Sequence, residues 1–313
     1  MRYLAFLVLF VLCSCASNND ENDTDQVADT DNMNNLSDYP KPKDPLIRSL
    51  PEELYPYEEN ILSSKRDFIN ITLNKVTEIE LVKKSKVGGY PYFPKDMDYP
   101  TNEKGEPLDF LAQINFSEIP ELEGYPTSGM VQFYLALDDL YGMDFDDPYT
   151  QKNYRVVYHK NLDKTSRTAF PELDAIRKND AYLSPKLNHD VFEMVFNKDS
   201  GYVPGFSIHF AEYFGEDTWP FFESFGDKED EIAEAYMDII SSTGHKIGGY
   251  PFFTQEDPRL YDQSIADWVL LFQLDTDGDD IMWGDAGVGN FFISKEALKN
   301  LDFSKVYYNW DCY

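Results

Sequence analysis

The strongest constraint on the fold of this chain is an internal repeat. Residues 86–93, KVGGYPYF, return as residues 246–253, KIGGYPFF, with six identities in eight positions at an offset of 160. Two further pairs of blocks recur in the same order: 110–115 with 270–275 at the same offset, and 129–135 with 287–293 after a slip of two residues. Because self-similarity at a fixed spacing marks a repeated structural unit, the sequence predicts a duplication with repeat blocks 86–137 and 246–295.

Each repeat predicts a tight turn followed by two antiparallel strands. The paired glycines, Gly88-Gly89 and Gly248-Gly249, can reach positive φ angles that other residues avoid, and the proline two positions later fixes the exit direction of the chain. Short runs rich in aromatic and branched residues, bounded by Gly, Pro or Asp, are typical of strands. Four runs are expected to be strands: 110–116, 131–137, 268–274 and 290–293.

Helices are expected in only two places. Residues 228–242 carry apolar side chains on one helical face and acids on the other, and residues 51–66 form a second candidate. The segment between the repeats, 155–226, is rich in aromatic residues, and its part 206–210 is expected to add a strand. The expected fold class is therefore α+β, with two sequence-related antiparallel-sheet halves packed as one globular domain over 46–313 and with few helices.

The first fourteen residues, 1–14, are typical of a cleaved signal peptide. Arg2 precedes an apolar run over 3–12 that is too short for a bilayer core, which needs roughly 20 helical residues. The segment LCSC that ends at Cys15 resembles the bacterial lipobox, in which a peptidase cuts before a lipidated cysteine. We therefore expect lipid on Cys15. Cys13 stands where the motif usually has a small residue, which leaves open which of the two is modified.

Residues 15–45 are expected to form the lipidated cysteine and a disordered acidic tether. From Ala16 onwards the segment consists mainly of Asn, Asp, Ser and Thr, and it ends in the proline-rich run 39–45. Such a composition cannot bury enough apolar surface to offset the entropy of the chain. The tether would hold the domain outside the cytoplasm at the bacterial cell envelope, on the cell membrane or the outer membrane.

The chain is strongly acidic, with a formal net charge of -30 at pH 7. Because nucleic acids and anionic bilayers repel such a body, we expect no nucleic-acid binding and membrane contact through the lipid anchor only. A basic protein partner is compatible with this charge, and so is a plain solvated surface. Cys312 is the one cysteine outside the lipobox segment, so no disulfide within the domain is expected.

Several separated motifs resemble the YwqG family of bacterial proteins of unknown function. They are Gly-Gly-Tyr-Pro, FLAQIN at 110–115, GYPFFTQEDPR at 249–259, and MWGDAG at 282–287 followed by FFI at 291–293. Together they cover the chain from about Lys86 to Tyr313. The resemblance implies a duplicated α+β fold and brings no established activity and no accepted catalytic residues. This chain differs from most such proteins in its export signal and tether, which makes it a lipoprotein version.

Two groups of residues are candidates for a ligand-binding cleft. In a glycine-rich segment, Trp283 could offer a stacking face and Asp285 an acceptor, while a core position and a turn are their alternative roles. The second group consists of polar pairs at equivalent strand ends, namely Gln113 with Asn115 and Gln273 with Asp275. A cleft between the halves could gather these pairs. Their alternative role is to satisfy buried backbone groups.

An acidic turn suggests a calcium site. Its carboxylates, on Asp275, Asp277 and Asp279, are the hard oxygen ligands that calcium prefers. The spacing does not fit an EF-hand, because Asp280 stands where the loop needs Gly and Ala286 where a glutamate should close the site. An acidic hairpin turn without metal is the alternative, and no other cofactor is expected.

No familiar catalytic motif stands out in the sequence. The four histidines are far apart and form no zinc-binding pair, and there is no phosphate-binding loop. We therefore expect a non-catalytic binding role towards a protein partner. One version is an immunity-like protein that neutralises a basic toxin at the envelope. The alternative is an enzyme or a small-ligand receptor with a cleft around Trp283 and Asp285, together with Gln113 and Gln273.

Overall fold

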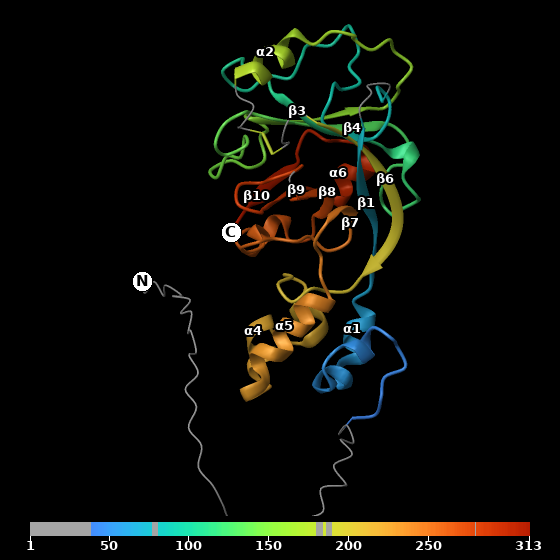
Figure 1. Cartoon of the computed structure of the whole chain (residues 1–313), viewed down its shortest axis with the longest axis vertical. Helices are drawn as coiled ribbons and strands as arrows, with labels where there is room; N and C mark the ends of the chain where they lie inside the picture. Colours follow the sequence, from blue (N-terminus) through green and yellow to red (C-terminus); the bar gives the residue numbers. More distant parts are fainter. Residues whose placement is uncertain (1–38, 77–80, 180–183, 186–189, 279) are drawn as a thin grey trace, which may run out of the picture. The chain divides into compact units, whose positions relative to one another are not determined.

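The computed structural model describes residues 39–76, 81–179, 184–185, 190–278 and 280–313 (Figure 1). Residues from Asp38 to Tyr313 form one compact unit. The expected signal peptide, Cys15 and the tether up to residue 38 lie outside the described residues. Within the described residues, no helix combines the length and the apolar composition that a membrane span requires.

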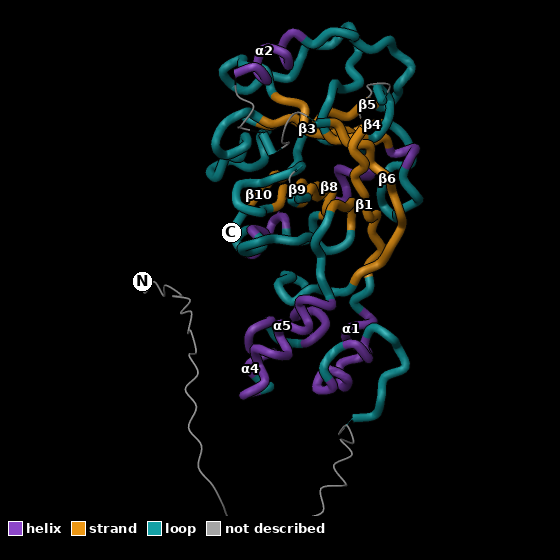
Figure 2. Tube along the Cα trace, viewed as in Figure 1, coloured by secondary structure: helices purple, strands orange, loops and turns teal. Residues whose placement is uncertain are grey.

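Ten antiparallel strands form a single curled sheet (Figure 2). Their bounds are Arg66–Val76 (β1), Lys86–Val87 (β2), Asp109–Asn115 (β3), Met130–Leu135 (β4), Tyr154–His159 (β5), Val191–Gly201 (β6), His245–Gly248 (β7), Val269–Asp275 (β8), Val288–Ile293 (β9) and Tyr307–Asp311 (β10). The four strands predicted from the sequence are confirmed as β3, β4, β8 and β9, with ends that differ by at most two residues. With six α-helices among the described residues, the fold is α+β and dominated by the sheet.

The two longest strands, β1 and β6, pair at the centre of the sheet. Their antiparallel register runs from Arg66 opposite Gly201 to Val76 opposite Val191. On the far side of β1 the order is β7, β8, β9, β10, and on the far side of β6 it is β2, β3, β4, β5. In the chain, β1 precedes β2 to β5, but in the sheet it pairs with β7. Likewise β6 precedes β7 to β10 in the chain but pairs with β2. Each half of the sheet is completed by a long strand from the other part of the chain.

The main hydrophobic core lies on the inner face of the curled sheet. Phe133 on β4 lies with its ring centroid 5.0 Å from that of Phe272 on β8 and 4.6 Å from that of Phe291 on β9. The two halves thus pack face to face. The curl also brings β5 close to the start of β10, because the hydroxyl of Tyr154 donates to the main-chain oxygen of Val306 at 2.6 Å.

Smaller apolar clusters cover the outer face of each half. Helix α2 (Pro171–Asn179) packs through Leu173 against Phe110 of β3 and Tyr134 of β4. In the other half, Ile265 of a short 3-10 turn packs at the equivalent place against Leu270 and Phe292. Aromatic and aliphatic residues on both faces of these strands explain why their sequence shows no simple alternation.

Most helices gather at one end of the folded unit, beyond the ends of β1 and β6 (Figure 1). They are α1 (Glu58–Ser63), α3 (Phe210–Phe214), α4 (Thr218–Glu223) and α5 (Glu229–Ile239); the remaining helix, α6 (Lys295–Asn300), follows β9. The first group encloses its own apolar core, in which Tyr236 donates to the main-chain oxygen of Val203 at 2.8 Å. The helix predicted over 228–242 is confirmed as α5. The one predicted over 51–66 corresponds to a 3-10 helix at Glu52–Tyr57 followed by α1.

The strand expected at 206–210 is wrong. Pro204 and Gly205 follow soon after the end of β6, and the chain turns into α3 at Phe210. Phe210 is buried because it stacks on Phe214, with ring centroids 4.2 Å apart, inside the helical core. The aromatic residues that suggested a strand serve instead to pack a turn and a short helix against other helices.

The folded unit also begins earlier than the expected boundary at residue 46. Pro42 is buried, and the side chain of Asp44 accepts a hydrogen bond from the main-chain nitrogen of Leu46 at 2.8 Å. The main-chain nitrogen of Asp44 donates to the side chain of Glu58 at 3.3 Å. These contacts tie the second part of the proline-rich run to the helical end of the unit, so residues 42–45 belong to the fold.

Replacing the phenylalanine that joins the two halves tests the shared core. Phe133→Ala is expected to lower the free energy of unfolding by about 3–5 kcal/mol, since it leaves a cavity between β4, β8 and β9. Val195→Ala on β6 is the control, because Val195 is 40% exposed, and it should cost less than about 1 kcal/mol. Urea unfolding followed by tryptophan fluorescence measures both. If Phe133→Ala lowered the free energy of unfolding no more than the control does, the two halves would not share this core.

Candidate functional site

The two glutamines singled out from the sequence, Gln113 and Gln273, lie in different halves and make the same hydrogen bonds there. The side-chain oxygen of each accepts the main-chain N–H of the residue after the Gly-Gly-Tyr-Pro sequence, Tyr92 at 2.9 Å and Phe252 at 2.8 Å. The side-chain nitrogen of each glutamine donates to two main-chain oxygens in the preceding loop. For Gln113 these are the oxygens of Val82 at 2.9 Å and Lys84 at 2.7 Å. For Gln273 they are those of Ser242 at 3.0 Å and Gly244 at 2.7 Å. Each glutamine holds a turn in its own half, and the two do not share a cleft.

Asn115 and Asp275 also bind the backbone. Asn115 caps a 3-10 turn by accepting from the main-chain nitrogen of Ser117 at 3.1 Å. Asp275 accepts from the main-chain nitrogens of Gly244 at 2.6 Å and Thr276 at 2.8 Å. Burial raises the pKa of Asp275, while the two backbone hydrogen bonds counteract that rise. Both side chains are thus engaged in holding loops.

Trp283 and Asp285 do not face a common site. Trp283 is completely buried in the inner core, where a side chain on Gly289 would collide with its indole ring, since a Cβ there would lie 2.3 Å from the ring. Asp285 is exposed, and its main-chain oxygen accepts from the nitrogen of Tyr313 at 3.1 Å. Trp283 therefore packs as part of the core, and Asp285 lies in an exposed turn beside it.

The acidic turn that suggested calcium is described only in part, because Asp279 lies outside the described residues. Asp277 lies 3.5 Å from the imidazole nitrogen Nε2 of His245, and Asp275 is engaged with the backbone as above. Among the residues that are described, no three carboxylate, imidazole or thiol side chains are grouped as metal ligands would be.

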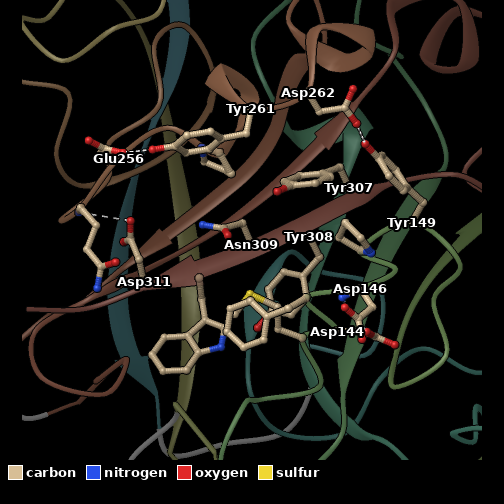
Figure 3. A pocket seen from close by; sticks show the side chains of 16 residues that line it. Asp144, Asp146, Tyr149, Glu256, Tyr261, Asp262, Tyr307, Tyr308, Asn309 and Asp311 are labelled. Atoms are coloured by element: carbon tan, nitrogen blue, oxygen red, sulfur yellow. Dashed lines mark hydrogen bonds between the residues drawn. The ribbon is translucent and has the colours of Figure 1, made fainter. Parts of the chain in front are cut away.

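The candidate site with the clearest chemistry is a groove along β10, with a volume of about 780 Å³ (Figure 3). All five residues of β10 line it, together with two loops that come from different halves. The lining residues of these loops are Met143, Asp144, Phe145, Asp146, Pro148 and Tyr149 from one, and Gln255, Glu256, Pro258, Tyr261 and Asp262 from the other. The volume lies within the range of roughly 300–1,000 Å³ that is usual for ligand pockets.

The groove is negatively charged. Five of its lining side chains are carboxylates, and no lysine or arginine is among the described residues that line it: the acids are Asp144, Asp146, Glu256, Asp262 and Asp311. Positive charge near the groove comes from Lys152, which pairs with Asp147 at 3.1 Å and lies 3.8 Å from Asp144, and from Lys305, whose Nζ lies 5.7 Å from the ring centroid of Tyr149. Asp311 accepts from the main-chain nitrogen of Thr254 at 3.1 Å, and burial raises the pKa of Asp311. A cation entering the groove would find carboxylates with little competing positive charge.

Aromatic rings flank these carboxylates. Phe145 on one loop and Tyr261 on the other are 74% and 78% exposed, which is unusual for such large side chains. Tyr261 and Glu256 are joined by a hydrogen bond, as are Tyr149 and Asp262, so the phenols orient two of the acids. Exposed aromatic faces beside carboxylates suit an ammonium or guanidinium group, which is attracted by both.

None of these groove residues was predicted from the sequence to form a site, although Gln255, Glu256 and Pro258 lie in the motif at 249–259. The two loops are separated by more than a hundred residues, and acidic, aromatic loops are common on solvated surfaces. The available signal was the aromatic C-terminal run that includes β10, in which Tyr307, Tyr308 and Trp310 are close together. Only the curl of the sheet shows that this run faces both loops.

Two buried lysines form a second feature that the sequence did not reveal. Lys86 on β2 and Lys246 on β7 occupy equivalent positions and are 1% and 4% exposed. Lys86 donates from Nζ to the main-chain oxygen of Leu81 at 2.9 Å, and Lys246 donates from Nζ to that of Ser242 at 2.5 Å. Burial lowers the pKa of both lysines to about 8. The two repeated lysines are therefore internal, and their charge costs stability at neutral pH.

Stability should depend on pH through these lysines. In the unfolded chain they keep a pKa of about 10.4, so between pH 8 and 10 the unfolded state binds more protons than the folded state. The two lysines should therefore make the free energy of unfolding rise as the pH is raised from 8 to 9. Closer to pH 10 the buried tyrosines, whose pKa burial raises, act in the opposite direction because they ionise first in the unfolded chain. The double variant Lys86→Met with Lys246→Met is expected to lose most of this rise and to be more stable at pH 7 by on the order of 1–3 kcal/mol for each lysine.

Denaturant unfolding at several pH values between 6 and 10 measures both effects. Lys65→Met is the control, because Lys65 is exposed, and it should leave the rise with pH intact. If the double variant kept the pH dependence of the original chain, the lysines would not be the buried groups responsible.

Comparison with known proteins places most of this unit in a family. A family model described as a domain of unknown function, DUF1963, matches residues 85–312. No curated protein matches the chain. The match covers the same part of the chain as the YwqG motifs, so the resemblance expected from the sequence is confirmed.

Proposed function

We propose, from the premise that this chain belongs to the DUF1963 family, that its folded unit is a binding protein which holds a positively charged segment of a partner protein in the groove along β10. The observation that carries the proposal is the set of five carboxylates in that groove with no lysine or arginine among its described lining residues. The groove contains carboxylates, amides and phenols, which suit recognition of a cation.

The size and position of the groove support a protein segment as the ligand. A volume of about 780 Å³ is enough for several side chains, and the exposed Phe145 and Tyr261 provide apolar contact area beside the acids. Aromatic residues of this kind are enriched where proteins bind one another. The net charge of -30 would steer a basic partner towards the chain from a distance and make its association sensitive to salt.

Neutralising acids of the groove should weaken binding of a basic peptide. The variant Asp146→Asn with Glu256→Gln and Asp262→Asn is expected to raise the Kd about tenfold or more for a fluorescent octapeptide of alternating Lys and Ser, measured by fluorescence anisotropy at 50 mM salt. Asparagine at position 262 keeps the oxygen that accepts from Ser264, so the local turn should persist.

The matched control removes the same charge elsewhere. Asp230→Asn with Glu234→Gln and Asp238→Asn changes three exposed acids of α5, and it should raise the Kd less than about threefold, through long-range charge alone. Equal losses in the two triple variants would show that the peptide responds to net charge and not to the groove.

We also propose that the two halves of the sheet arose by duplication of one unit. The equivalent hydrogen bonds of Gln113 and Gln273 support this, and so do the register shifts found at the same place in both halves, after Phe110 in β3 and after Leu270 in β8. The mirrored strand order about β1 and β6 agrees with it. Under this proposal each unit comprises one long strand and the four shorter strands that follow it in the chain.

Finally, we propose that the chain is a lipoprotein anchored through Cys15 at the bacterial cell envelope, outside the cytoplasm. The support is the sequence alone, namely Arg2, the apolar run over 3–12 and the segment LCSC before a polar, acidic stretch. Such an anchor would place the acidic unit near a membrane surface while the tether keeps it free to meet a partner.

Substituting each cysteine of the lipobox tests the anchor and identifies the lipidated residue. In a bacterial host, Cys15→Ser is expected to abolish the diacylglyceryl modification in the mature N-terminal peptide, as seen by mass spectrometry, and to move the protein out of the membrane fraction. Cys13→Ser should leave both unchanged. The reverse pattern would assign the lipid to Cys13, and an unmodified N-terminus in the original chain would exclude the anchor.

A further inference from the structure

We infer that the basic segment binds as an extended strand that pairs with the free edge of β10, through the main chain of Trp310. This inference rests on the function proposed above and specifies the conformation of the ligand. Strand pairing depends on main-chain hydrogen bonds of the partner, whereas the carboxylates attract its basic side chains. Strand pairing and charge attraction can therefore be tested separately.

The first observation is that β10 is the last strand of the sheet. Among the strands that the structure describes, β10 pairs with β9 alone, in a register that places Tyr308 opposite Phe291 and Trp310 opposite Gly289. In an antiparallel pair, the main-chain groups of alternate residues face the neighbouring strand, and those of the residues between them face away. The main-chain nitrogen of Tyr308 donates to the oxygen of Pro148 at 3.4 Å, outside the sheet. Tyr308 and, by alternation, Trp310 therefore direct their N–H and C=O groups to the open side.

The second observation is how this open side is covered. At Tyr308 the carbonyl of Pro148 takes the place of a neighbouring strand. The opposite edge of the sheet is covered in a similar way, because Val156 of β5 donates from its main-chain nitrogen to the side chain of Gln151 at 2.7 Å. For Trp310, no main-chain hydrogen bond outside the sheet occurs within the described part of the chain. A short stretch of edge thus remains available for pairing.

The third observation is the position of the groove relative to this edge. Successive side chains of a strand point to opposite faces, so a cavity over one face would touch only alternate residues. The groove touches all five residues of β10 from Tyr307 to Asp311, and it therefore runs beside the strand. The indole of Trp310 is fixed by a hydrogen bond from Nε1 to the main-chain oxygen of Leu140 at 2.7 Å.

The acids flank a strand in this position from both sides. Figure 3 shows Asp144 and Asp146 on one side of β10 and Glu256 and Asp262 on the other. Because side chains of an extended peptide alternate between two faces, successive residues would point to opposite groups of carboxylates. The partner segment is therefore expected to carry adjacent Lys or Arg residues, each satisfied on a different side. Added strands of this kind bind through main-chain hydrogen bonds and gain specificity from alternate side chains.

Backbone methylation of the ligand separates strand pairing from charge attraction. The probes are a fluorescent octapeptide of Lys and Arg and two versions of it, N-methylated at the odd or at the even positions. Methylation leaves the charges intact but blocks pairing on one edge of the peptide. One version should bind at least about tenfold more weakly than the unmethylated peptide, and the other within about threefold.

Amide hydrogen exchange gives an independent readout on the intact folded unit. On binding the unmethylated peptide, exchange at the main-chain N–H of Trp310 should slow at least about tenfold, whereas that of Tyr308, already bonded to Pro148, should change little. Equal binding of both methylated peptides, with unchanged exchange at Trp310, would overturn strand pairing and leave the charge-based function standing. If the unmethylated peptide failed to bind, or bound the groove-neutralised triple variant equally well, the proposed function would fail together with this inference.

Discussion

The pairing of β1 with β6 is the interaction on which the rest of the structure depends. These strands run antiparallel over eleven residue pairs, and every other strand attaches to the sheet outward from them. Because β1 supports β7 and β6 supports β2, neither half has a complete sheet without a strand from the other part of the chain. The curl then closes the inner core, where Phe133 meets Phe272 and Phe291. A single cooperative unit follows from this exchange of long strands.

The short strands next to this seam are held largely by side chains. β2 has two residues and β7 four, too few for many ladder hydrogen bonds. Gln113 and Gln273 supply the missing bonds by accepting one main-chain N–H and donating to two carbonyls each. A buried amide whose groups are satisfied in this way stabilises a specific loop conformation. The neighbouring Lys86 and Lys246 work against stability, because burial of each ammonium costs more than its carbonyl acceptor returns, and for Lys246 the charges of Asp275 and Asp199 offset only part of that cost.

The groove is a consequence of where the sheet ends. A free sheet edge invites pairing with any available strand, and proteins commonly blunt such edges with charge or cover them with loops. Along β10 both devices are present, since Pro148 covers one position and carboxylates surround the remainder. Because the chain is acidic, these carboxylates repel a second copy of the same molecule and attract a basic segment. Protection of the edge and selection of a partner can therefore come from the same side chains.

The sequence by itself determined four of the ten strands, the paired-glycine turns and the α+β class, because these follow from local composition and backbone preference. The paired glycines do adopt positive φ, with values of 75° and 70° at Gly88 and Gly89, and the motifs correctly indicated the family. The sequence also indicated that Gln113 and Gln273 are equivalent, but not that each serves a turn in its own half. Only the tertiary structure decided that the long strands are exchanged, that Trp283 is buried, and that loops far apart in the chain meet beside β10. These features depend on the strand register and on the curl of the sheet. Both are set by the burial of side chains from segments far apart in the chain, so no single segment carries a signal for them.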